Sequence, residues 1–176
     1  LFLDQRECWP YGNGHVYASG GFLHVNGDGH QRIAKLDAGG SGAPDASWAP
    51  TTDERIWTIA IDNDGLIYIG GDFTNISGAT RVHAARLSPN APGSADTWNP
   101  APDCTVRTIA PDNAGSVYLG GCFIQLNGFF RPFVAKVSAD TAQLDPNWGD
   151  SQAPDGSLHT LRIAAICRTK QPVQIE

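Results

Sequence analysis

Residues 67–73 of the chain read Ile67-Tyr68-Ile69-Gly70-Gly71-Asp72-Phe73, an apolar run of β-branched and aromatic residues that leads into two glycines. Closely similar strings stand at residues 16–22 and 117–123, so their tyrosines recur at intervals of 51 and 50 residues. Such residues favour strands, and a glycine pair marks a bend or the close approach of another segment. The stretch therefore predicts a strand that occurs three times.

The period extends well beyond this strand. Each copy is followed by a turn glycine, then by a basic residue flanked by alanine and an aliphatic residue, and then by a tryptophan. These residues recur after 50 or 51 positions as Gly27, Gly78 and Gly128, as Lys35, Arg86 and Lys136, and as Trp48, Trp98 and Trp148. Repetition at this period is typical of arrays in which each unit packs against its neighbours.

Each unit predicts several short strands. Residues 106–110 and 116–119 are strand formers separated by Asp112-Asn113-Ala114-Gly115, in which Asn and Gly tolerate the positive φ of a tight turn. A short apolar segment at 123–126 and a third strand at 133–137 follow. Four short antiparallel strands in about 50 residues predict an all-β fold built from β-propeller blades.

The blades are expected at residues 9–57, 58–107 and 108–160, with a divergent tail at 161–176. Leu158-His159-Thr160-Leu161 begins a fourth unit, because it resembles Ile56-Trp57-Thr58-Ile59. Propellers typically contain 4 to 8 blades. Three blades therefore predict part of a larger or oligomeric propeller, completed by more chain, by a protein partner or by self-association.

The string from Gly70 to Gly78, followed by Ala84-Ala85-Arg86-Leu87, resembles the bacterial delta-60-type propeller repeat. Leu144-Asp145-Pro146-Asn147-Trp148 is similar to a further part of that repeat. The resemblance implies a propeller in secreted or surface-exposed bacterial proteins, and it implies no shared enzymatic activity or catalytic residues. The kelch repeat also has a glycine pair after a strand at a similar period, but its Tyr and Trp lie only a few residues apart after that pair. In this chain the Trp lies 27 residues after Gly71 or Gly121, so the kelch repeat is the second choice.

The recurring aromatic residues are expected to pack the blades against one another. They are Trp48, Trp98, Trp148, Phe22, Phe73 and Phe123. The recurring basic residues allow two interpretations. They form repeated structural ion pairs or hydrogen bonds to a neighbouring blade, or they form a ring that binds an anion or a glycan; they are Lys35, Arg86 and Lys136.

Cys104 and Cys122 flank the hairpin centred near Asn113 at equal distances in sequence, which predicts either a cross-strand disulfide or two buried thiols. The corresponding residues of the second unit are Glu54 and Asp72. These two carboxylates would repel each other unless a cation, calcium for example, or an arginine lies between them. For Cys8 and Cys167 the sequence leaves open a bond between the first and last units or to another chain.

Asp62-Asn63-Asp64-Gly65 resembles the start of a calcium loop, but it lacks the later ligands and the closing glutamate. We therefore expect a hairpin turn at these residues. The sequence contains no Cys-x-x-Cys pair, and its histidines are not spaced as zinc ligands are, so no zinc site is predicted. No cofactor is expected.

The formal net charge is −6, and the 12 basic residues are scattered. Nucleic-acid binding needs a basic footprint, so it is not expected. No apolar stretch reaches the ~20 residues of a membrane span, and no nucleophile motif such as G-x-S-x-G occurs. The expected function is a secreted or cell-surface, non-enzymatic module for protein interaction or structure. A carbohydrate-binding propeller and a kelch-like propeller enzyme are the alternatives.

Overall fold

The computed structural model describes residues 14–27, 29–149, 154 and 156–161. In these residues the chain forms antiparallel strands and no helix. The first unit contains β1 (His15–Ser19) and β2 (Ile33–Asp37). The second contains β3 (Ile56–Ile61), β4 (Ile67–Gly71), β5 (Asn75–Ile76), β6 (Ala79–Thr80) and β7 (Ala84–Leu87). The third contains β8 (Val106–Pro111), β9 (Ser116–Gly121), β10 (Gln125–Leu126), β11 (Phe129–Phe130) and β12 (Val134–Ser138). The described part of the chain has no helix of the length and apolarity that a membrane crossing requires.

The strands of each unit form a sheet of their own, which we call a blade. The second blade has the order β3-β4-β7, the third has the matching order β8-β9-β12, and the first shows β1-β2. The short hairpins β5–β6 and β10–β11 form separate two-stranded sheets within the second and third units. In every blade the tyrosine of the repeat lies directly opposite its basic residue, in the pairs Tyr17–Lys35, Tyr68–Arg86 and Tyr118–Lys136.

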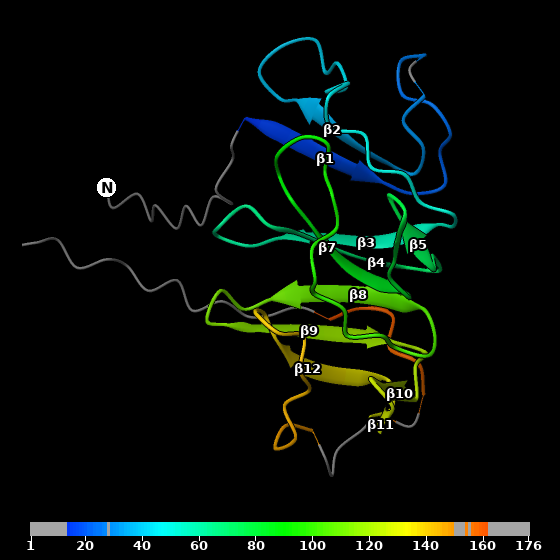
Figure 1. The fold of residues 1–176 in the computed structure, drawn as a ribbon, viewed down its shortest axis with the longest axis vertical. Coiled ribbons are helices and arrows are strands. Elements are labelled where there is room, and N and C mark those ends of the chain that lie inside the picture. The colour runs from blue at the N-terminus through cyan, green and yellow to red at the C-terminus, as the bar shows by residue number, and fades with distance from the viewer. Residues whose placement is uncertain (1–13, 28, 150–153, 155, 162–176) are drawn as a thin grey trace, which may run out of the picture.

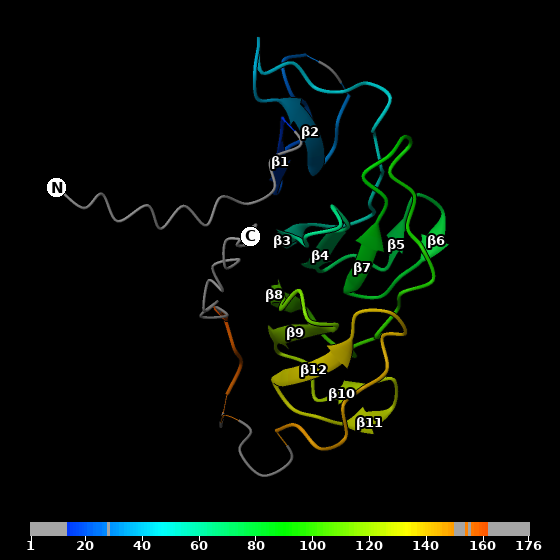
Figure 2. The same ribbon diagram turned by 90° about the vertical axis from the view of Figure 1, so that its left-hand side faces the viewer.

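The three blades form an open stack in chain order (Figure 1). β3 and β8, the first strands of their blades, lie at one edge of this stack, and the β5–β6 and β10–β11 hairpins lie toward the opposite edge (Figure 2). Each blade therefore turns one face toward the next blade along the chain. This is the packing expected for consecutive propeller blades, and the all-β propeller fold predicted from the repeat is confirmed.

The hydrophobic core consists of two clusters, one at each contact between blades. Ile33 and Trp48 of the first blade pack with Ile67 and Ile69 of the second. Tyr68 and Trp98 of the second blade pack in the same way with residues of the third, among them Val106, Val117 and Leu119. Trp48 and Trp98 are fully buried, as are Phe73 and Phe123, whereas Phe22 and Trp148 are only half-buried.

The glycine pair of the repeat lets neighbouring segments approach. A Cβ atom on Gly70 would lie 2.6 Å from Cγ1 of Val106 in the next blade, and one on Gly71 would strike the carbonyl oxygen of Arg55. Gly120 and Gly121 are equally constrained, by Leu158 and by the carbonyl oxygen of Thr105. In the second and third units a side chain at either glycine would separate the strands, whereas the first unit has Ser19 at the position of Gly70.

The segment that follows β2, β7 or β12 pairs with that strand through a single bridge in the described residues. The bridges are Leu36–Pro44, Leu87–Ala95 and Val137–Leu144. Before the bridge of the second blade the chain reads Ser88-Pro89-Asn90-Ala91-Pro92-Gly93-Ser94. Proline cannot donate a ladder hydrogen bond and glycine weakens a strand, so this segment is irregular up to the tryptophan.

Candidate functional site

The tryptophans of the first two repeats each join their own blade to the next one. The indole Nε1 of Trp48 donates a 2.8 Å hydrogen bond to the carbonyl oxygen of Ser88, and Trp98 donates a 3.0 Å hydrogen bond to that of Ser138. Each tryptophan also packs edge-on against the tyrosine of its blade, with ring centroids 5.1–5.2 Å apart in the pairs Tyr17–Trp48, Tyr68–Trp98 and Tyr118–Trp148. Trp48 and Trp98 therefore lie at the contacts between blades.

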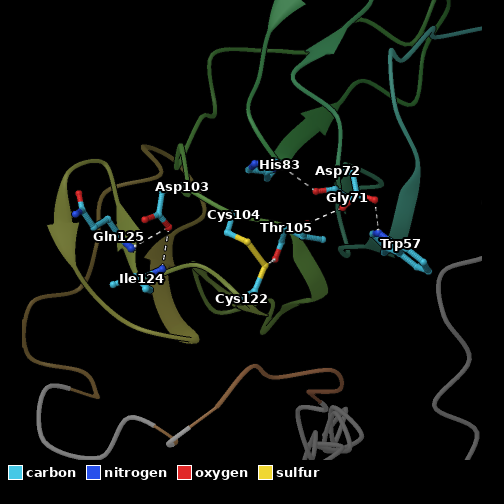
Figure 3. The surroundings of a disulfide bond; sticks show 10 residues. All are labelled: Trp57, Gly71, Asp72, His83, Asp103, Cys104, Thr105, Cys122, Ile124 and Gln125. Carbon is cyan, nitrogen blue, oxygen red and sulfur yellow. Dashed lines mark hydrogen bonds between the residues drawn. A yellow bond between two sulfur atoms is a disulfide. The ribbon is translucent and has the colours of Figure 1, made fainter.

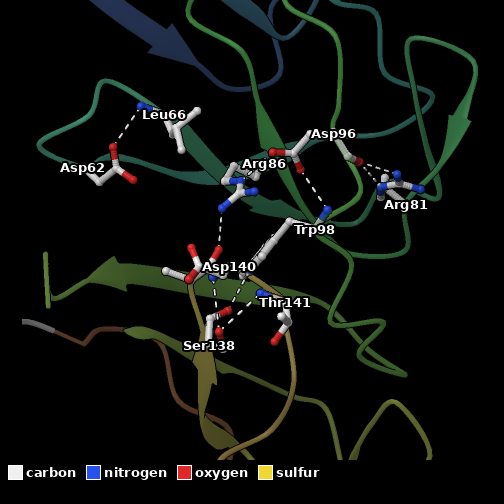
Figure 4. Close-up of polar contacts among 10 residues, drawn as sticks. Asp62, Leu66, Arg81, Arg86, Asp96, Trp98, Ser138, Asp140 and Thr141 are labelled. Atoms are coloured by element: carbon white, nitrogen blue, oxygen red, sulfur yellow. Dashed lines mark hydrogen bonds and ion pairs between the residues drawn. The ribbon is translucent and has the colours of Figure 1, made fainter. Parts of the chain in front are cut away.

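All three recurring basic residues form ion pairs. Each forms an ion pair with an aspartate of its own blade, at 3.3 Å in Lys35–Asp45, 2.6 Å in Arg86–Asp96 and 3.0 Å in Lys136–Asp145. Lys35 also donates to the carbonyl oxygen of Pro89, and Arg86 to that of Ala139, in the following blade. Figure 4 shows Arg86 between Asp96 and the end of β12.

These contacts explain why the pKa values of Asp45, Asp145 and Arg86 differ from their ordinary values. The hydroxyl and backbone N–H of Ser47 and the ammonium of Lys35 lower the pKa of Asp45 to about 2 against the opposing effect of burial. The hydrogen bond from Lys136 likewise lowers the pKa of Asp145. Burial alone would lower the pKa of Arg86, but its contacts with Tyr68 and Asp96 raise it. The charges are therefore held in pairs.

A cavity of about 200 Å³ lies between the second and third blades and is bordered by Arg86 and Tyr68. The other charged groups that line it are the carboxylates of Asp62, Asp64 and Asp140. Three carboxylates and one paired guanidinium make a poor anion site. The surroundings of Arg86 thus favour the structural interpretation of the basic residues over the anion-binding one.

Cys104 and Cys122 form a disulfide, with their Cα atoms 5.6 Å apart (Figure 3). At the equivalent place in the second blade, the carboxylate of Asp72 accepts hydrogen bonds from Trp57 Nε1 at 2.8 Å and from Thr105 Oγ1 at 2.6 Å. Asp72 is thus held by neutral donors, one of them from the next blade.

Glu54 and Asp72, the two carboxylates considered as metal ligands, occupy the positions in the second unit that correspond to Cys104 and Cys122. The described residues contain no group of three or more potential His, Cys, Asp or Glu ligands, so Glu54 and Asp72 have no third such ligand there. Cys8 and Cys167 lie outside the described residues.

The Asp62-Asn63-Asp64-Gly65 segment is a hairpin turn. Asp62 accepts backbone hydrogen bonds from Asp64 at 3.0 Å and from Leu66 at 2.9 Å. Asp112 holds the corresponding turn of the third blade through Ala114 and Ser116. Because the Asp62 carboxylate closes the turn on itself, the hairpin interpretation is confirmed.

One surface cluster was not foreseen from the sequence. The guanidinium carbons of Arg55 and Arg107 lie 4.8 Å and 5.7 Å from the ring centroid of Trp57, a residue that is 45% exposed. The corresponding residues of the later units are Arg107 and His159, so an aromatic residue at this place is particular to the second unit. A position-by-position comparison of the repeats could have revealed it.

A second surface feature lies on the β10–β11 hairpin. Phe129 and Phe130 are 62% and 73% exposed, and the neighbouring Ile124 is 46% exposed. The residues at the two phenylalanine positions in the second blade are Ala79 and Thr80. The third blade therefore displays an apolar hairpin where the second displays small or polar side chains.

Residues 63–97 match the model of a family described as a domain of unknown function (DUF5122) beta-propeller. The matched segment contains β4, the β5–β6 hairpin and β7. Comparison with curated proteins gave no match, and neither did comparison with solved structures. The match agrees with the resemblance of Gly70–Gly71 and the residues that follow to a delta-60-type repeat. The chain is therefore a β-propeller module in which residues 63–97, in the second blade, are similar to the DUF5122 beta-propeller family.

Proposed function

We propose that this propeller is a secreted or cell-surface interaction module that binds a protein partner and carries out no catalysis. The observation that carries the proposal is the pair Phe129 and Phe130, which are 62% and 73% exposed on the β10–β11 hairpin. Exposed apolar patches on soluble proteins commonly mark contact surfaces. Large aromatic side chains also contribute most strongly to binding at such surfaces.

Two further observations support the proposal. The basic residues that recur in the repeat are engaged in ion pairs and contacts between blades, and these roles are structural. The Cys104–Cys122 disulfide fits an oxidising compartment, which supports the extracellular location.

Carbohydrate binding at one site per blade would require exposed aromatic residues that recur with the repeat. Trp57 is exposed, but Arg107 and His159 take its place in the later units. The exposed phenylalanines of the third blade likewise correspond to Ala79 and Thr80. The aromatic positions therefore favour a single protein-binding hairpin over a set of sugar sites.

The repeat itself supplies the test. The double variant Phe129→Ala/Phe130→Thr gives the third hairpin the side chains of the second, so the strand pairing is expected to be kept. The wild-type chain and this variant are each immobilised and exposed to cell-surface and secreted proteins of the source organism.

We expect a protein that the wild type retains and the double variant releases. Retention of the same proteins by both would contradict the proposed surface. Binding of the wild type to a glycan array, with no protein retained, would favour the carbohydrate-binding alternative.

A further inference from the structure

Trp57 and Arg107 occupy the same position of the repeat, and both leave the regular pairing of their strands. The register of β3 with β4 shifts at Trp57, and the register of β8 with β9 shifts at Arg107. A bulge re-aims a side chain out of the alternating pattern of its strand, and bulges are common beside functional sites. Trp57 is accordingly 45% exposed, whereas Ile56 before it is buried. β3 and β8 lie at the same edge of the stack, so the two bulges are neighbours (Figure 2).

Two guanidinium groups converge on the ring of Trp57. The guanidinium carbon of Arg55 lies 4.8 Å from the ring centroid, and that of Arg107 lies 5.7 Å from the same centroid. A cation–π contact attracts the cation through the ring quadrupole, but it provides no oxygen acceptor for the N–H donors. Arg55 is exposed and Arg107 is half-buried, so this pair of cations can be reached from solvent.

The other arginines that the structure describes have oxygen acceptors within the protein. They are Arg32, Arg81, Arg86 and Arg131. Arg55 and Arg107, by contrast, donate no hydrogen bond and form no ion pair within the described residues. The Nε atom of Arg107 is also buried without a hydrogen-bond partner. Because a buried donor without an acceptor is destabilising, this guanidinium calls for an oxygen that the described residues do not supply.

Asp72 fixes the ring and sets the charge of the cluster. Its carboxylate accepts a 2.8 Å hydrogen bond from Trp57 Nε1 and a 2.6 Å hydrogen bond from Thr105 Oγ1 (Figure 3). Two guanidinium charges and one carboxylate charge leave one net positive charge here, in a chain whose formal net charge is −6. A carboxylate brings one negative charge, and its plane matches the fork of guanidinium donors. A carboxylate therefore fits the cluster better than an anion of higher charge.

We propose that Arg55, Trp57 and Arg107 form a binding site for a carboxylate, which is carried either by a small organic acid or by an acidic sugar. The two guanidiniums donate to the carboxylate oxygens, and the ring of Trp57 holds the guanidiniums in position. The third unit has Thr105 in place of Arg55 and Arg107 in place of Trp57, so it does not repeat the site. The β10–β11 hairpin lies toward the opposite edge of the stack, so this site is separate from the proposed protein-binding surface (Figure 2).

The first test is isothermal titration calorimetry of the full chain with lactate, glucuronate, glucose and inorganic phosphate. We expect lactate and glucuronate to bind and glucose, the neutral counterpart of glucuronate, not to bind. Equal affinities for lactate and glucuronate would assign the site to a free organic acid, and tighter binding of glucuronate would assign it to an acidic sugar. Binding of neither carboxylate at millimolar concentrations, or tighter binding of phosphate, would overturn the proposal.

The second test assigns the binding to the two arginines. Arg55→Gln and Arg107→Gln are each expected to weaken carboxylate binding by about tenfold or more, because each removes charged donors. Arg81→Gln is the matched control, since it removes the same charge from an arginine whose acceptors are the carbonyl oxygens of Thr80 and Asp96. It is expected to leave the affinity unchanged, and circular dichroism shows whether each variant keeps its strands. Equal affinities of the wild type and Arg55→Gln/Arg107→Gln would overturn the proposal.

The carboxylate site and the proposed protein-binding surface can be tested independently. Phe129→Ala/Phe130→Thr is expected to bind the carboxylate as tightly as the wild type, because it changes only the opposite edge of the stack. Loss of carboxylate binding in this variant would contradict a site at Trp57. A wild type that binds a carboxylate through Arg55 and Arg107 but retains no protein would overturn the proposed function alone.

Discussion

The indole Nε1 of Trp48 donates a 2.8 Å hydrogen bond to the carbonyl oxygen of Ser88, forty residues later and in the next blade. Trp98 and Ser138 repeat this bond at 3.0 Å with the same separation in sequence. Both tryptophans are fully buried, so each combines a large apolar contact with a satisfied backbone acceptor. The contact between blades is therefore specified by one residue type at one period.

Trp98→Phe is expected to lower the free energy of unfolding by about 1–3 kcal/mol, because the ring is largely kept while the Ser138 carbonyl loses its donor. Urea unfolding followed by circular dichroism gives this value. Trp57→Phe removes a comparable indole bond, to Asp72, at an exposed site and is expected to cost less. Equal losses for the two variants would show that burial of the acceptor does not matter.

Gly70→Ala is expected to lower the free energy of unfolding by about 1–3 kcal/mol, because its Cβ would lie 2.6 Å from Val106 Cγ1. Part of this loss should be recovered when Val106→Ala is added, so a double-mutant cycle measured by urea unfolding is expected to show favourable coupling. Gly29→Ala, where nothing lies within 4 Å of the new Cβ, is the control. Additive losses would argue against direct contact.

Cys104→Ser/Cys122→Ser is expected to lower the free energy of unfolding by about 3 kcal/mol, the value for releasing a loop of 18 residues from the unfolded chain. Denaturant titration of the wild type and the double variant gives the difference. Because Asp72 holds the equivalent place in the second blade without a disulfide, the double variant should still fold. An unchanged midpoint would mean that the disulfide adds no stability.

Asp45 has a pKa of about 2, below its ordinary value of 3.8, so the folded state favours its ionised form. The stabilisation that it provides is complete above the ordinary pKa and is lost as the pH falls through the lowered one. The difference in stability between the wild type and Asp45→Asn, measured by thermal unfolding, should therefore shrink between about pH 5 and pH 2. A difference independent of pH would assign the role of Asp45 to its shape and not to its charge.

Much of the fold could be predicted from the sequence, because period, strand formers and turn residues agree in every unit. The sequence placed Cys104 and Cys122 on either side of one hairpin but left a disulfide and two buried thiols open, because the register was not known; in the structure the register shifts at a bulge between Val106 and Thr108, and the two cysteines are bonded. The partners of Lys35, Arg86 and Lys136 were left open, since the aspartates that bind them lie in irregular segments before the tryptophans. The exposed Trp57 cluster could not be predicted from the period, since only the second unit has an aromatic residue there.

Neither the exposure of Phe129 nor that of Phe130 could be predicted from hydrophobicity, which would place both in the core. Leu126 is buried while both phenylalanines are exposed, although Phe129 pairs directly with Leu126 in the β10–β11 hairpin. A two-residue strand carries too little pattern to reveal its buried face.

The repeated tryptophan bond and the matching hydrophobic clusters make the two contacts between blades alike. A duplicated or deleted stretch of about 50 residues would join one such contact to another without requiring a new core. Genes with such repeats can therefore gain or lose blades by unequal recombination and still encode a folded product. The side chains of the short outer hairpins remain free to diverge, as Ala79 and Phe129 have done.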